Sequence, residues 1–124
     1  MKQLSIDLSW ILDVAREAGH EDPAILDYGV AIAAVERHRA VWAETTVYDG
    51  PFVRAAALAH TLGRLRWLER SNVRVAIAVA YGYLLGCDLP VKLDQPKVSA
   101  LAIELRNEEC TAERIAALLR TWTT

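Results

Sequence analysis

The sequence predicts an all-α protein, a compact orthogonal bundle of about six helices around a buried central helix, with a small flap loop or hairpin. Three observations support this. Apolar residues recur at helical spacing along most of the chain, capping residues stand before most of these runs, and one apolar stretch has almost no polar face. The chain has 124 residues and is 53% hydrophobic, so we expect a single domain over residues 1–124.

The first half of the chain predicts two helices and the flap. Asp7 is a good N-cap for a first helix that ends near Gly19. Asp22 and Pro23 then predict a short turn or helix, because Asp caps helices and Pro is tolerated at the first helical position. Asp27 can cap a second helix over residues 28–37. Residues 40–48 are rich in types that favour extended backbone, so we interpret them as the flap, a loop or small hairpin.

The second half predicts the buried centre and the helices that close the fold. Residues 49–51 read Asp-Gly-Pro and open a third helix that stops near Gly63. Residues 72–85 are almost uniformly apolar, which predicts a helix buried nearly all round, with Gly86 as its C-cap. Asp94 begins another helix, and Thr111 caps the last one, which carries apolar residues up to Trp122.

Composition limits the class of function. The formal net charge is -2 and the pI is near 5.9, which argues against a dedicated nucleic-acid binder. Cys87 and Cys110 are far apart and lie in no Cys-x-x-Cys pair, so neither a disulfide framework nor a zinc site is expected. The N-terminus lacks the apolar run of a signal peptide, and no stretch is long enough to span a bilayer. We therefore expect a cytoplasmic protein with no membrane partner.

The turn before the apolar helix is basic. Residues 64–74 read Arg-Leu-Arg-Trp-Leu-Glu-Arg-Ser-Asn-Val-Arg, with Glu69 as the only acidic residue. This segment resembles the active-site motif of the Fic/Doc family, His-x-Phe-x-Asp/Glu-Gly/Ala-Asn-x-Arg, which ends Asn-Lys-Arg in the Doc branch. Asn72 and Arg74 match that motif. Arg66 stands at the histidine and Arg70 at the acidic residue, so the motif is degenerate.

The resemblance continues in register over residues 27–122 and implies the Fic/Doc order of elements. It places Tyr48 where the family often has a tyrosine at the end of the flap. The flap of Fic enzymes docks a target peptide, which makes four residues candidates for partner binding: Trp42, Thr45, Thr46 and Tyr48. An equally weighted alternative is that Trp42 only covers the edge of the core.

The resemblance also implies what the substitutions remove. The motif histidine is the general base of Fic proteins, and a guanidinium at Arg66 keeps its proton throughout the accessible pH range. The motif acid holds Mg²⁺, which Arg70 would repel, and Glu69 is one position out of place. We therefore expect no bound metal, no cofactor and no conventional catalytic residue.

The anion-holding half of the motif remains. A helix N-terminus favours phosphate or carboxylate, and nearby arginines add donors. The candidate anion-binding residues are Asn72, Arg74, Arg66, Arg70 and Ser71. The alternative is that these arginines form a solvated surface and pair with nearby acids.

The histidines are weaker candidates. His60 lies six residues before the lost base, which places it on a different turn, so we expect a structural or surface role. His20 and His38 show no metal-ligand spacing, so metal binding by them is not expected.

Three functions remain open. The first is a catalytically degenerate Doc-like toxin-family protein that acts as a binding or regulatory component of a toxin–antitoxin-type pair, with a short helical antitoxin-like protein as partner and a possible nucleotide or phosphate ligand. The second is an active nucleotidyl- or phosphotransferase, either an AMPylase or a Doc-type protein kinase, that uses ATP with Mg²⁺ at a rebuilt arginine-rich site. The third is nucleic-acid binding by the basic turn, which the acidic net charge disfavours.

Overall fold

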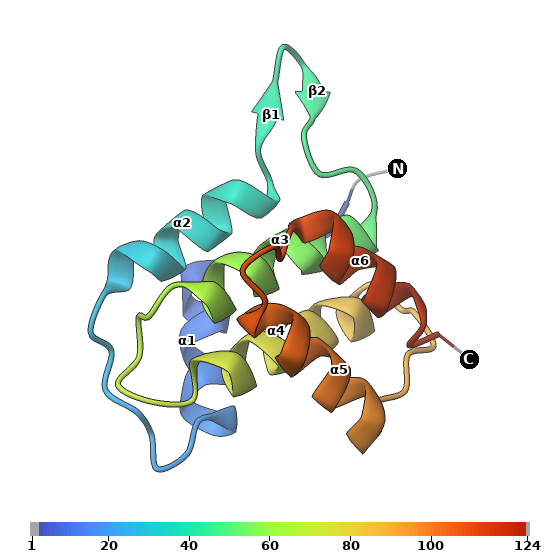
Figure 1. Ribbon diagram of the computed structural model, residues 1–124. Coiled ribbons are helices and arrows are strands. Elements are labelled where there is room, and N and C mark those ends of the chain that lie inside the picture. Colours follow the sequence, from blue (N-terminus) through green and yellow to red (C-terminus); the bar gives the residue numbers. More distant parts are fainter. Residues whose placement is uncertain (1–2, 124) are drawn as a thin grey trace.

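The computed structural model describes residues 3–123 and confirms the all-α fold (Figure 1). Within this range there are six helices and one two-stranded hairpin. The elements are α1 (Leu8–Ala18), α2 (Tyr28–His38), β1 (Val41–Trp42), β2 (Thr45–Thr46), α3 (Pro51–Arg64), α4 (Asn72–Gly86), α5 (Gln95–Arg106) and α6 (Ala112–Arg120).

The helices gather around α4, as the apolar sequence predicts. Six of its apolar residues are at most 1% exposed: Val75, Ala76, Val79, Ala80, Tyr83 and Leu84. α3 packs against α4 along most of its length and also contacts α2, α5 and α6. The centre of the fold is therefore a pair of helices, because α3 is alanine-rich and its small side chains let four neighbours approach closely.

The predicted caps are present at four helix starts. Asp7, Asp27, Asp94 and Thr111 each accept a hydrogen bond from a backbone N–H in the first turn of the helix that follows. The predicted boundaries hold within a residue or two at the other ends: α3 runs one residue past Gly63, and α4 includes Gly86 and is capped by Cys87.

The alternative of a short helix at Asp22 and Pro23 is wrong. Glu21 and Asp22 both have positive φ, which no α-helix allows, and the chain then forms an isolated bridge between Ile25 and Leu68. Contacts with the basic loop between α3 and α4 therefore override the local helix-start signal.

The flap is a hairpin, one of the two predicted forms. Val41 pairs with Thr46 and Trp42 with Thr45, and the two turn residues between them have positive φ. Figure 1 shows the hairpin projecting from the bundle at the end of α2. The Trp42 side chain is 79% exposed, so it does not cover the edge of the core.

Within residues 3–123, no helix combines the length and the apolar character needed to cross a membrane.

Candidate functional site

The basic loop of residues 65–71 is held in shape by the Asn72 side chain. Its Oδ1 atom accepts hydrogen bonds from the backbone N–H groups of Trp67 and Leu68, at 3.1 and 3.0 Å, and its Nδ2 atom donates to the Leu68 carbonyl at 3.0 Å. The Asn72 side chain thus links three backbone groups of the loop, and we call this set of three hydrogen bonds the Asn72 clamp. These bonds occupy most of the polar capacity of the Asn72 side chain, which leaves little of it for a ligand.

Residues 20–27 pack along the same loop. The N–H of Ala24 donates to Glu69 Oε1 at 2.8 Å, and the N–H of Glu69 donates back to the Ala24 carbonyl at 2.9 Å. The N–H of Leu26 donates to the Trp67 carbonyl at 2.7 Å. The Glu69 carboxylate therefore joins two loops and also pairs with Arg70 at 3.0 Å.

Arg70 and Ser71 are tied to the end of α1. Arg70 Nη1 donates to the His20 carbonyl at 2.8 Å, and Ser71 Oγ accepts the N–H of His20 at 3.1 Å. Ser71 has φ of 68° and therefore occupies the left-handed region that favours glycine.

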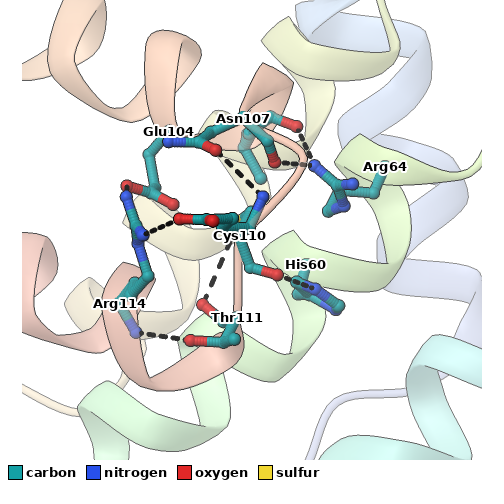
Figure 2. A network of polar contacts seen from close by, with 9 residues as sticks. His60, Arg64, Glu104, Asn107, Cys110, Thr111 and Arg114 are labelled. Atoms are coloured by element: carbon teal, nitrogen blue, oxygen red, sulfur yellow. Dashed lines mark hydrogen bonds and ion pairs between the residues drawn. The ribbon is translucent and has the colours of Figure 1, made fainter.

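Arg64, the last residue of α3, and Arg66 in the loop differ in how many hydrogen bonds they make. Arg64 donates to the carbonyls of Leu105 and Asn107, which anchors α3 to the end of α5 (Figure 2). Arg66 is exposed and makes one long hydrogen bond, 3.4 Å, to the Glu69 carbonyl. Arg66 is therefore held less firmly than Arg70.

A groove of about 510 Å³ lies beside the loop, between the start of α4 and α5. Its lining residues are Ser71, Asn72, Val73, Arg74, Ile77, Val98, Ala102 and Arg106. The exposed side chains of Arg74 and Arg106 supply its positive charge, and Ile77 and Val98 supply apolar surface.

Backbone donors add to this charge. Among residues 3–123, no acceptor is found for the N–H groups of Asn72, Val73 and Arg74, the first three of α4. The groove thus combines two guanidinium groups with the positive end of a helix, an arrangement that favours an anionic group.

The groove is lined by only some of the five residues that the sequence predicts to bind an anion. Arg74 lies in the groove, Asn72 and Ser71 line it with side chains engaged elsewhere, and Arg66 and Arg70 are absent from its lining. Arg106 was missed, since its position as the last residue of α5 gives no sign of the groove it borders. Its only sequence signal was its charge.

The candidate flap residues divide in a similar way. The side chains of Trp42 and Thr45 are exposed at the hairpin, and Thr46 is half-buried. Tyr48 points back to the bundle, where its hydroxyl accepts a hydrogen bond from Arg37 Nε at 2.7 Å. Tyr48 therefore holds the foot of the hairpin.

The three histidines have different surroundings. His38 is fully buried, its Nε2 accepts the N–H of Ile6 at 3.1 Å, and burial lowers its pKa. His60 is half-buried on α3. His20 is exposed beside the basic loop, with its ring 3.6 Å from a Glu21 carboxylate oxygen. In the described part of the chain, no three His, Cys, Asp or Glu side chains gather in an arrangement that could hold a metal ion.

Comparison with known proteins identifies a relative of this chain. The chain is 33% identical to the protein named Toxin Doc of Mycolicibacterium smegmatis over 97 residues, which cover 77% of this chain and 75% of that protein. No family model matches the chain.

Proposed function

This chain belongs to the Doc toxin family, and from that membership we propose that it is a catalytically degenerate member that acts by binding, as the toxin-side or regulatory component of a toxin–antitoxin-type pair. One observation carries the proposal. The groove lies beside the basic loop of residues 65–71, which we also call the motif loop. It is lined by two arginines and by no His, Asp, Glu or Cys side chain, so it offers positive charge for an anion and no group that accepts a proton near neutral pH.

The loss of a base has a predictable effect on chemistry. General-base catalysis contributes about 10²- to 10⁴-fold to rate, and a guanidinium at Arg66 cannot replace it. Arg70 occupies the position of the family's metal ligand and donates to backbone carbonyls. The positive charge of the Arg70 guanidinium repels a divalent cation, so we expect transfer activity to be slight.

The groove supports binding of an acidic, partly apolar segment. Arg74 and Arg106 lie on its two walls, contributed by different helices, with apolar side chains between them. An amphipathic helix with carboxylates on one edge matches this pattern, and a short helical antitoxin-like protein is the partner we propose.

The hairpin supplies a second contact region. It precedes α3, whereas the motif loop follows it, and α3 has 14 residues and is therefore about 20 Å long. A phosphate or small nucleotide cannot reach both regions. A protein partner can, which favours a macromolecular occupant over a small ligand alone.

The binding arm of the test co-expresses this chain with the products of the genes that neighbour its own, one at a time, and purifies any complex through a tag on one partner. We expect a stable complex that is weakened at least about tenfold by the double variant Arg74→Glu, Arg106→Glu, because charge reversal places like charges across the interface. Arg120→Glu is the matched control, an exposed arginine at the end of α6, away from the groove lining. Failure of this chain to associate with any of these products would remove this partner.

The activity arm incubates the chain with labelled ATP, GTP, UTP or CTP, Mg²⁺ and a cell lysate. We expect no labelled protein above the level of a reaction without the chain. Label that depends on the chain and disappears in the Arg74→Ala, Arg106→Ala variant would contradict degeneracy.

One feature favours a second candidate function, an active nucleotidyl- or phosphotransferase with a rebuilt site that uses ATP and Mg²⁺. His20 lies next to the motif loop, through the bonds of its backbone to Ser71 and Arg70, and an imidazole can serve as a base. In this case label transfer in the activity arm would be present in the wild-type chain and lost in His20→Gln.

A further inference from the structure

The hairpin is joined to the bundle through few contacts. Within residues 3–123, strands β1 and β2 contact each other and no other helix or strand. The chain returns to the bundle at Tyr48, and Gln3 holds the next two residues by accepting the N–H of Gly50 at 2.8 Å and donating to Asp49 at 3.0 Å. On the other side, the N–H of Ala40 donates to the Arg37 carbonyl at 3.1 Å, and the N–H of Val47 donates to the Ala40 carbonyl at 3.0 Å. The orientation of the hairpin therefore depends on these backbone bonds and on the side-chain contacts of Tyr48.

Arg37, near the end of α2, holds Tyr48. Its Nε donates to the Tyr48 hydroxyl at 2.7 Å. Its Nη1 lies 2.8 Å from His60 Nδ1 and donates to Thr61 Oγ1 at 3.1 Å, and both of these residues are on α3. One guanidinium thus connects the hairpin foot to the central helix.

This connection requires one protonation state of His60. A guanidinium nitrogen can only donate, so His60 Nδ1 must carry no proton and accept. The ring proton then lies on Nε2, which donates to the Cys110 carbonyl at 3.2 Å. Figure 2 shows His60 pointing at that carbonyl, in the turn between α5 and α6 that Arg64 also binds.

The surroundings of His60 disfavour its protonated form. Burial lowers the pKa of His60, the hydrogen bond to the Cys110 carbonyl opposes this effect, and the charges of Arg37 and Arg64 lower the pKa further. The groups that face the ring are Arg37 from α2, Thr61 and Arg64 from α3, and the Cys110 carbonyl from the turn before α6. No carboxylate of the described residues pairs with it.

We propose that Arg37, Tyr48 and His60 form a proton-sensitive lock that sets the orientation of the hairpin and so regulates its availability to a partner. While His60 is neutral, Arg37 ties Tyr48 to α3. When Nδ1 gains a proton, it becomes a donor facing a second donor, two positive charges stand at hydrogen-bond distance, and Arg37 releases the hairpin foot. The inference rests on the proposed role of the hairpin in partner binding.

The experiment follows backbone order by ¹⁵N relaxation in the free protein while the His60 ring is titrated in the same samples. We expect order parameters of the Trp42 and Val47 amides near the rigid value of about 0.85 at pH 7.5, falling below about 0.6 as His60 becomes protonated. The Val79 amide, in the middle of α4, should stay rigid and so separates release of the hairpin from unfolding.

Variants test each part of the lock. Arg37→Met should free the hairpin at every pH. Arg39→Met is the matched control, because Arg39 is exposed at the same helix end and its side chain bonds, among residues 3–123, to Glu36 alone. His60→Gln keeps an acceptor without a titrating group. Its hairpin should therefore remain ordered both at pH 7.5 and at the pH at which His60 of the wild-type chain is protonated. A hairpin that stays ordered in Arg37→Met, or that loosens with acid equally in His60→Gln, would overturn the lock.

Failure of the lock and failure of the proposed function give different results. A hairpin that responds to His60 in a chain that binds no antitoxin-like protein removes the proposed function and leaves the lock. Partner binding by a chain whose hairpin does not respond removes the lock and leaves the function.

Discussion

Replacing Asn72 by alanine should destabilise the protein through the motif loop and not through a ligand. The substitution removes three hydrogen bonds, two from the N–H groups of Trp67 and Leu68 and one to the Leu68 carbonyl. Both loop residues are fully buried, so their amides cannot easily turn to water. At about 1 kcal/mol for each net bond, and more where a donor is left unpaired, we expect a loss of about 2–4 kcal/mol in the free energy of unfolding.

Urea unfolding followed by circular dichroism at pH 7 measures this loss. Asn107→Ala is the matched control, because the Asn107 side chain accepts one local bond, from the N–H of Glu109 at 2.9 Å, and is not a clamp between buried amides. It should cost about 1 kcal/mol or less. Asn72→Asp should fall between the two, since it keeps the acceptor for both loop amides and loses the donor to Leu68.

An Asn72→Ala variant as stable as Asn107→Ala would refute the role of the clamp. The expected result also affects how binding experiments are designed. A ligand lost from Asn72→Ala would reflect a disordered loop as readily as a missing contact, so the exposed residues Arg74 and Arg106 are the better probes of the groove.

Three further outcomes follow from local geometry. Ser71→Gly should change the unfolding free energy in urea by less than about 1 kcal/mol, because relief of the left-handed backbone offsets the lost bond to His20, whereas Ser71→Val should cost about 1–3 kcal/mol. Gly63→Ala should lower thermal stability, by about 1–3 kcal/mol, because a Cβ there would stand 3.0 Å from both Ala76 and Leu105. Burial lowers the pKa of His38, so its contribution to stability should be complete above about pH 6.5 and be lost as the pH falls from there towards the lowered pKa; chemical denaturation between pH 7.5 and 5 measures the slope, and a flat profile would contradict a buried neutral ring.

The helices were predictable because their signals are local. Caps such as Asp7 and Thr111 bond within the next three residues, and apolar spacing reports a buried face without knowledge of what covers it. The same reasoning allowed a helix at Asp22 and was wrong, since the Ile25–Leu68 bridge joins residues far apart in the sequence.

The candidate site was predictable in part. The motif resemblance located the loop, and Arg74 lies in the groove beside it. Arg106 escaped notice because it reaches the groove only through the packing of α5 on α4. Arg70 was expected to hold an anion, and that remains a prediction; the structure shows its guanidinium donating to the His20 carbonyl.

Residue order along the chain was thus sufficient for the helices, for a flap that is either a loop or a hairpin, and for the Doc-family relationship. The loss of the motif base stays a prediction. The roles of individual polar side chains depended on the folded arrangement. Asn72 as a loop clamp, Arg106 as a wall of the groove and Arg37 as the tie between hairpin and α3 all arise from particular distances between atoms. Hydrogen bonds demand that geometry within a few tenths of an ångström, and only the packing of the helices sets it.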